Sequence, residues 1–165
     1  MNSPHSPLRV LSPSISARGL KAFCGHCGRS PREDVPTGLS RVCSRCGLGL
    51  ILRARPEVAP SAADPFLVVD TSLAVCALSR QAELLLGVRE TDAVNRHVTQ
   101  FLVPAEPEAP TPHNLVALLA WSARGHAEPR SVVVRPTATF GVRYWARVGS
   151  CGPPPAALVV LASAA

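Results

Sequence analysis

Aromatic residues are scarce in this chain, which has four phenylalanines, two tryptophans and one tyrosine among 165 residues. Long apolar runs are missing as well, because no segment approaches the roughly 20 residues that cross a bilayer. The N-terminal stretch MNSPHSPLRVLSPSISARGL has one early arginine, and prolines interrupt its apolar parts, so it is a poor signal peptide. We therefore expect a cytoplasmic protein that makes no contact with a membrane.

The signatures of the common enzyme classes are also missing. The chain has no nucleophile–base motif, no glycine-rich phosphate loop and no paired-carboxylate motif. Apolar residues make up 47% of the sequence, which is enough for a core, while 17 prolines and 11 glycines imply many turns. We expect a folded protein that is not an enzyme.

Acidic residues are few in the N-terminal third. Residues 1–60 contain nine Lys/Arg and three Asp/Glu, and the remaining residues contain eight of each, so the net charge of +6 lies on the first part. A local basic surface is typical of contact with nucleic acid or an acidic partner. An arginine-biased, flexible region produces the same balance by default. The sequence leaves both interpretations open.

Four of the six cysteines form two Cys-x-x-Cys-Gly units with 15 residues between the inner cysteines. Two cysteines at this spacing can turn both sulfurs toward one ion, and the glycine after each pair permits the positive φ of the bend. In a reducing compartment such pairs indicate metal ligands before disulfides. We predict a structural Zn²⁺ site with these ligands: Cys24, Cys27, Cys43 and Cys46.

Four protein ligands leave no open position for substrate, so we expect no catalysis by this metal. The module has few apolar side chains, and we expect it to need the metal for folding. Two disulfides, a rubredoxin-like iron site, or His26 in place of one thiol are the alternatives. Because His26 lies between Cys24 and Cys27, its side chain is expected to point away from the metal and into solvent.

The two Cys-x-x-Cys-Gly units, called knuckles below, resemble together a zinc ribbon or a rubredoxin-like finger. Proteins of that type bind nucleic acid, bind protein, or hold a terminus together, and the metal spacing does not choose among these roles. If this module binds nucleic acid, the candidate phosphate contacts are basic residues around the cysteines: Arg29, Arg32, Arg41 and Arg45.

Composition divides the chain into four parts. Residues 1–20 are rich in Ser and Pro and are predicted to be disordered. Residues 21–52 hold the cysteine module. Residues 53–63 have two prolines and no apolar periodicity, which predicts a linker. Residues 64–165 carry regular patterns and are predicted to form the main domain.

The first half of that domain begins with two apolar runs, FLVVD and LAVCALS, around an Asp-Thr-Ser turn, which predicts a β-hairpin. Ser79 can cap a short helix that ends at Gly87. Apolar residues at helical spacing then predict a second helix over 91–102. Residues 104–113 hold four prolines and are predicted to be a loop, after which Asn114 caps a helix ending at Gly125.

Three strand candidates close the chain: SVVVR, FGVRYWARV and AALVVLA. In the middle one, Val142, Tyr144, Ala146 and Val148 face one way, which predicts a sheet with one buried face. Cys151, beside GPPP, is expected in a hairpin turn. The two groups of strands can join into one antiparallel sheet with helices on one face, an α+β fold.

Residues 64–102 resemble the opening half of a PAS domain: strand, acidic turn, strand, and a Ser-capped helix carrying Ala82, Glu83, Leu85, Leu86 and Gly87. The closing strands fit the rest of that fold by pattern. The resemblance implies a five-stranded antiparallel sheet, a hydrophobic pocket between sheet and helices, and a sensory or protein-interaction role, often in a dimer. Trp121 and Trp145 are expected to support packing or a dimer face.

The same resemblance guides the cofactor prediction. The Asn-Cys-Arg-Phe-Leu-Gln motif of flavin-binding light sensors does not occur in this sequence. Haem-binding members use a helical histidine that faces the pocket, but a lone histidine such as His97 is usually a surface or packed residue. We expect structural zinc and neither flavin nor haem.

Three functions remain open. The first is a signalling or regulatory protein, with transcriptional regulation as its context, in which the PAS-like domain senses a ligand or partner and the zinc module is the contact surface. The second is a nucleic-acid-binding regulator that uses the basic N-terminal third. The third is an interaction scaffold with an empty PAS-like core. The sequence favours the first.

Overall fold

A computed structural model describes residues 19–32, 41–105, 114–126 and 128–163. Nearly all of the segment predicted to be disordered, and most of the predicted proline-rich loop, lie outside these ranges. The described elements are β1 (Lys21–Cys24), β2 (Ile51–Ala54), β3 (Phe66–Val69), β4 (Val75–Leu78), α1 (Arg80–Leu86), α2 (Glu90–Ala93), η1 (Val98–Gln100), β5 (Leu102–Pro104), α3 (Leu115–Ala123), β6 (Arg130–Pro136), β7 (Tyr144–Gly152) and β8 (Ala156–Ser163).

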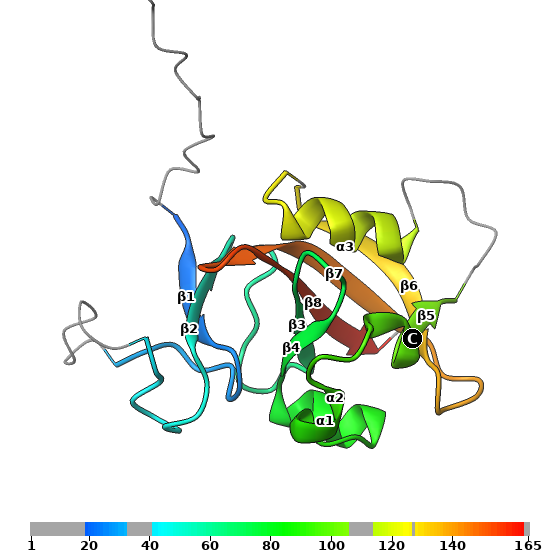
Figure 1. Cartoon of the computed structure of the whole chain (residues 1–165), viewed down its shortest axis with the longest axis horizontal. Helices are drawn as coiled ribbons and strands as arrows, with labels where there is room; N and C mark the ends of the chain where they lie inside the picture. The colour runs from blue at the N-terminus through cyan, green and yellow to red at the C-terminus, as the bar shows by residue number, and fades with distance from the viewer. Residues whose placement is uncertain (1–18, 33–40, 106–113, 127, 164–165) are drawn as a thin grey trace, which may run out of the picture.

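The strands form a single antiparallel sheet (Figure 1). Its central part has the order β4-β3-β8-β7-β6, so the hairpin at the start of the domain pairs with the last strand of the chain. The short β5 extends the edge at β6, and the β1–β2 hairpin joins at the end of β7. The predicted α+β arrangement, with two groups of strands in one sheet, is confirmed.

Local signals in the first half of the domain act as predicted. The Asp70 carboxylate accepts hydrogen bonds from the backbone N–H groups of Ser72 and Ala74, which closes the β3–β4 turn. The Ser79 hydroxyl accepts from the N–H of Ala82 at the start of α1, and Gly87 ends that helix with φ 65°. These bonds satisfy backbone groups that the turn and the helix ends would leave unpaired.

The predicted helix over 91–102 is wrong. Helix α2 ends at Ala93, and Asn95 has a φ of 67°, which no α-helix contains. The backbone here bonds to β4 instead: the N–H of Asn95 donates to Val75, and the N–H of Val75 donates to Arg96. Tertiary hydrogen bonds thus replace the helical ones, and the apolar residues of this stretch are divided among η1, β5 and the turn before them.

The closing strands are present, but β7 begins at Tyr144, so residues 140–143 of the predicted middle strand, with Val142, lie outside it. Within β7 the predicted alternation holds. Ala146 and Val148 are buried on the face of β7 that meets the helices, whereas Trp145, which has the opposite orientation, is 47% exposed. Cys151 differs from its prediction: it is buried within β7 and pairs with Ala54 and Ala156, so it is not a turn residue.

Two hydrophobic clusters lie on the two faces of this sheet. The larger joins α1, α2, η1 and α3 to the inner face, through residues such as Leu86, Leu118 and Val159. The smaller lies on the outer face, where Phe23 and Leu52 of the β1–β2 hairpin pack with Phe66, Leu158 and other residues of the central strands. The cysteine module therefore shares a core with the main domain, instead of standing apart from it.

The segment predicted to be a linker is part of this packing. Arg53 and Ala54 belong to β2 and pair with Gly152 and Cys151 of β7. Val58 is fully buried, and a Cβ added to Gly149 would lie 2.9 Å from its Cγ1. The structure corrects the prediction of a linker over residues 53–63, since this segment is packed against the sheet. Composition suggested a loose chain because the partners of this stretch lie about 90 residues away in the sequence.

Candidate metal centre and its contact with the main domain

The name ribbon is used below for residues 19–32 and 41–54, and the name main domain for residues 64–163. The four predicted cysteine ligands lie together in the ribbon, with all four Sγ atoms within 4.8 Å of one another. The Sγ atoms of Cys24 and Cys46 are 3.6 Å apart, and those of Cys27 and Cys43 are 3.9 Å apart. A disulfide needs about 2.05 Å, so the four thiols are free and face one small volume that can hold a metal ion.

Backbone N–H groups of each knuckle point toward the Sγ atom of its first cysteine. The N–H groups of His26 and Cys27 lie 3.4 Å from Cys24 Sγ, and the N–H of Arg45 lies 3.4 Å from Cys43 Sγ. The glycines that close the two units, Gly28 and Gly47, have φ values of 70° and 68°. The bend predicted from the Cys-x-x-Cys-Gly pattern is therefore present in both knuckles.

A glycine outside that pattern makes room for the cluster. A Cβ at Gly49 would collide with Cys24 Sγ and would lie 2.8 Å from the Cβ of His26. The second knuckle thus lies directly against the first at this point. Gly49 had no signal in the sequence, because its close neighbours Cys24 and His26 come from the other half of the ribbon.

The thiols differ in their readiness to ionise. Burial raises the pKa of Cys24 far above its ordinary value, despite hydrogen bonds from backbone N–H groups. Burial also raises the pKa of Cys46, but donors from Gly49, Leu48 and the neighbouring thiols outweigh that effect and lower its pKa to about 6. A lowered pKa at Cys46 favours its thiolate, and four sulfur donors in one small volume suit a soft cation.

His26 does not point into solvent as predicted. Its Nδ1 lies 3.0 Å from Oε2 of Glu90 in α2, with the two side chains 19% and 28% exposed. The other carboxylate oxygen of Glu90 accepts from the backbone N–H of Leu78, and the backbone N–H of Glu90 donates to Glu83. His26 thus joins the ribbon to the hydrogen bonds that Glu90 makes with Leu78 of β4 and Glu83 of α1.

Apolar and backbone contacts reinforce this link. The rings of Phe23 and Phe66 meet edge to face, with centroids 5.7 Å apart. A Cβ at Gly28 would lie 2.6 Å from the carbonyl oxygen of Ser61, and the N–H of Arg80 donates to the carbonyl of His26 at 3.3 Å. The first knuckle is therefore held against the main domain on several sides.

The four arginines predicted to contact nucleic acid are all exposed. Two of them hold the fold together: the Arg45 Nε donates to the carbonyl of Ser30, and the Arg41 guanidinium donates to the carbonyl of Pro153. The side chains of Arg29 and Arg32 make no hydrogen bond or ion pair within the described part of the chain. The structure thus does not gather the four into one unpaired basic surface.

His97, the histidine considered for haem, lies exposed at the start of η1. Its Nδ1 is 2.7 Å from the hydroxyl of Thr99. The larger cluster lies between the helices and the sheet, where the resemblance implied a ligand pocket.

The main domain keeps the predicted order of elements along the chain, a β-hairpin, short helices and three closing strands, with the short β5 added between η1 and α3. The fold is PAS-like. Among solved structures, the chain is similar to the PAS domain of an HTR-like protein from Haloarcula marismortui, with 13% identity, a TM-score of 0.46, and coverage of 61% of this chain and 81% of that one. It is also similar to the PAS domain of nitrogen regulation protein NR(II) from Vibrio parahaemolyticus, with 15% identity, a TM-score of 0.44, and coverage of 62% and 90%.

Five central strands in one antiparallel sheet, with the helices packed on one of its faces, are the arrangement that the resemblance implied. No protein-family model and no curated protein matches the sequence. Among the described helices, none combines the length and the apolar character of a membrane span.

Proposed function

We propose that this protein is a small, non-enzymatic regulatory module in which a zinc-loaded ribbon and a PAS-like sensory domain act as one unit. The observation that carries the proposal is the contact between the ribbon and the helices of the main domain, through His26 and Glu90. A signal that moves α1 or α2 would move the first knuckle with it, because His26 bonds to Glu90 of α2 through its imidazole and to the N–H of Arg80 in α1 through its carbonyl.

Zinc is the metal that suits these donors. Four thiols at mutual distances below 4.8 Å fit a closed tetrahedral site, and Zn²⁺ binds such sites without redox chemistry. When bound, the ion would neutralise the thiolates and hold the two knuckles together. Cys24, Cys27, Cys43 and Cys46 would all be ligands, which leaves no position for substrate and supports a structural role.

The expected context is signal transduction or control of transcription in the cytoplasm. The ribbon is the proposed contact surface for a protein partner, since apolar side chains remain exposed on it, Leu48 at 72% and Val42 and Leu50 at 45% each. The outer sheet face around Trp145 is available for self-association. A change in the main domain would then alter the position of the ribbon and its affinity for the partner.

Native mass spectrometry of the freshly purified protein tests the first requirement, one zinc ion per chain. Hydrogen exchange with and without a chelator tests the second requirement, that the ribbon and the main domain act as one unit. Removal of the metal should increase exchange in α1, α2 and β4 as well as in the ribbon, because they are joined through Glu90. A metal-free protein, or exchange that changes in the ribbon alone, would contradict a module that acts as one unit.

The nucleic-acid function is the competing proposal. The unpaired side chains of Arg29 and Arg32 favour it, and the bonding of Arg41 and Arg45 within the fold does not. Phosphate contacts make affinity fall steeply as salt rises. Gel retardation of the zinc-loaded protein on duplex and single-stranded oligonucleotides at low and high salt distinguishes the two. Salt-sensitive retardation would favour nucleic acid, and its absence at low salt would exclude it.

A further inference from the structure

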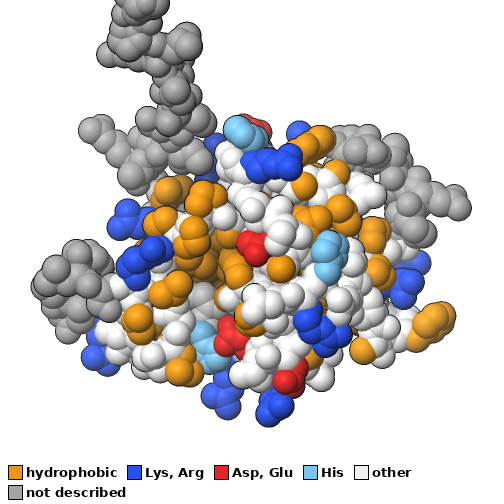
Figure 2. Space-filling model, viewed as in Figure 1, with side chains coloured by type: hydrophobic (Ala, Val, Ile, Leu, Met, Phe, Trp, Pro, Cys, Tyr) orange, Lys and Arg blue, Asp and Glu red, His pale blue; other side chains and the backbone are white. Residues whose placement is uncertain are grey.

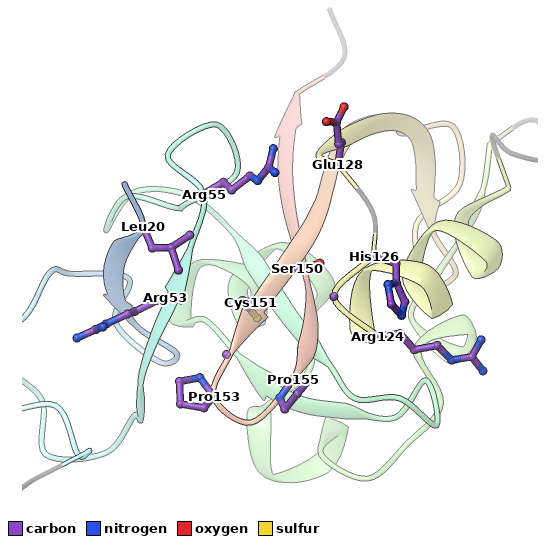
Figure 3. Close-up of a pocket in the computed structure, with 12 residues that line it drawn as sticks. Leu20, Arg53, Arg55, Arg124, His126, Glu128, Ser150, Cys151, Pro153 and Pro155 are labelled. Carbon is purple, nitrogen blue, oxygen red and sulfur yellow. The ribbon is translucent and has the colours of Figure 1, made fainter. Parts of the chain in front are cut away.

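A pocket of about 500 Å³ lies where the ribbon meets the main domain (Figure 3). Its volume falls within the range of roughly 300 to 1,000 Å³ that small-molecule sites occupy. Its walls come from the end of β2, the C-terminal part of β7 with the turn after it, and the segment following α3. Its polar lining includes Arg55, His126, Glu128 and Ser150, and its apolar lining includes Leu20 and Cys151.

This pocket exists only because the ribbon is docked. Arg53 pairs with Gly152, and Leu20 directly precedes β1, so one wall belongs to the ribbon. The opposite wall belongs to the end of α3. In the space-filling view, hydrophobic side chains gather between these two walls, and basic side chains lie on either side (Figure 2). None of the residues that line the pocket belongs to the larger cluster between the helices and the sheet.

The charge of the pocket favours an anion. Three arginines and a histidine line it against one carboxylate, that of Glu128. In Figure 3 the guanidinium of Arg55 extends toward β7 and the imidazole of His126 lies on the other side, with Ser150 between them, whereas the Arg53 and Arg124 guanidinium groups point outward. Three donors of different kinds, from Arg55, His126 and Ser150, thus surround the floor of the pocket.

Ser150 adds an independent observation. Its hydroxyl oxygen is buried and has no hydrogen-bond partner, and it is the one buried side-chain oxygen or nitrogen in the described ranges in this state. A buried hydroxyl without a partner costs free energy, and native proteins rarely leave one. A ligand oxygen in the pocket would accept its hydrogen bond.

The rest of the lining is apolar. Leu20, Cys151, Pro153 and Pro155 offer carbon and sulfur surface and no side-chain charge. A phosphate group alone would leave this surface unused, and a neutral apolar molecule would leave the donors unused. An apolar body that ends in a carboxylate uses both, since a carboxylate accepts hydrogen bonds on two oxygens.

We propose that this pocket binds a small amphipathic carboxylate, with its oxygens toward Arg55, His126 and Ser150 and its apolar body against Leu20 and the prolines. The proposal rests on the sensory function given above and names the class of ligand that is sensed. Because both walls contribute, such a ligand stabilises the docked ribbon, and the stabilisation grows with the ratio of ligand concentration to Kd.

Amide chemical-shift titrations of the zinc-loaded, ¹⁵N-labelled protein test this with three probes of one chain length: octanoate, 1-octanol and octylamine. Octanoate should give saturable shifts at Arg55 and Ser150–Gly152. Loss of the charge-assisted hydrogen bonds should weaken 1-octanol about tenfold relative to octanoate, and octylamine should bind least. Equal binding of octanoate and 1-octanol, shifts confined to other residues, or no shift with octanoate would overturn the proposal.

Two variants assign the contacts. Arg55→Gln should weaken octanoate about tenfold and leave 1-octanol nearly unchanged, and Ser150→Ala should weaken octanoate several-fold. Arg135→Gln is the matched control, since Arg135 is exposed on β6 away from the pocket. Unchanged octanoate affinity in Arg55→Gln would contradict the assignment. Zinc content and chelator-induced exchange do not depend on this ligand, so a failure here is distinguishable from a failure of the proposed regulatory unit.

Discussion

The imidazole Nδ1 of His26 lies 3.0 Å from the carboxylate Oε2 of Glu90, across 64 residues of sequence. One residue belongs to the first knuckle of the ribbon, and the other begins α2 of the main domain. The other oxygen of Glu90 accepts from the N–H of Leu78, 3.0 Å away in β4. A single carboxylate thus bonds to the ribbon with one oxygen and to the sheet with the other.

Removal of this link should be measurable. His26→Ala should lower the free energy of unfolding by about 0.5–1.5 kcal/mol, and Glu90→Ala by about 1–3 kcal/mol because it also leaves the Leu78 N–H without its partner. Urea denaturation of the zinc-loaded protein gives both values. Glu57→Ala is the control, since this carboxylate is exposed and its side chain has no bond in the described residues. The double variant should lose less than the sum of the two single variants; strict additivity would mean that the pair is not coupled.

Loss of a predicted ligand should affect the whole fold. Cys43→Ser should abolish stoichiometric zinc binding and lower the thermal midpoint of the main domain, since the ribbon contributes Phe23 and Leu52 to the outer-face core. Cys76→Ser serves as the control, because Cys76 is exposed and lies outside the cluster. Zinc analysis and calorimetry give the two readouts. A Cys43→Ser protein that melts like the wild type would show that the ribbon does not stabilise the main domain.

Two phenylalanines provide a matched comparison of packing. Phe23 is fully buried and contacts Phe66 edge to face, whereas Phe140 is 96% exposed. Phe23→Ala should destabilise the protein by about 3–5 kcal/mol because it leaves a cavity between ribbon and sheet. Phe140→Ala should change the stability by less than about 0.5 kcal/mol. Chemical denaturation measures both, and similar effects for the two variants would contradict the shared core.

The two knuckle glycines differ in their surroundings and not in their conformation. Gly28 and Gly47 have nearly equal positive φ values, so alanine should cost each about 1 kcal/mol through the backbone alone. A Cβ at Gly28 would also lie 2.6 Å from the carbonyl oxygen of Ser61, while at Gly47 there is nothing within 4 Å. Gly28→Ala should therefore be the more destabilising by at least about 1 kcal/mol. Equal losses in thermal melts would mean that the first knuckle is not pressed against residues 61–62.

Asp70 predicts a defined dependence of stability on pH. Burial raises the pKa of this carboxyl, but hydrogen bonds from the Ser72 hydroxyl and from the N–H groups of Ala74 and Ser72 outweigh that effect and lower it below the ordinary value of 3.8. A lowered folded-state pKa contributes stability above the unfolded pKa, and this contribution is lost as the pH falls through the folded value.

Asp70→Asn removes this titration and keeps an acceptor oxygen for the turn. The stability difference between wild type and Asp70→Asn should be constant near neutral pH and should shrink below about pH 4. Urea denaturation at a series of pH values measures it. A difference that grows as the pH falls would have the wrong sign for a lowered pKa.

Much of this structure was predictable because its signals are local. The cap at Ser79, the stop at Gly87 and the alternation along β7 each depend on residues within a few positions of one another. The long helix predicted over 91–102 failed for the opposite reason. Its spacing suits a helix, but Asn95 and Arg96 bond to Val75 in a strand that lies about 20 residues earlier.

The candidate sites divide in the same way. The four-thiol cluster was predicted from spacing. The two cysteines of each pair are close in the sequence, and the 15-residue insert has only to reverse the chain once to bring the two pairs together. The role of Glu90 and the pocket around Ser150 had no signal in the sequence, because their partners come from distant strands and helices. The same holds for Val58, which composition placed in a linker and which the outer face of the sheet buries.

The amino-acid sequence by itself determined the cysteine knuckles, the capped helices α1 and α3, and a set of strands able to form one sheet, since periodicity and bond geometry act between near neighbours. Only the tertiary structure decided that the knuckles dock onto that sheet. Docking depends on which apolar surfaces meet when strands far apart in the chain pair, and on the burial of Phe23 against Phe66. The pocket between ribbon and main domain is a consequence of that choice.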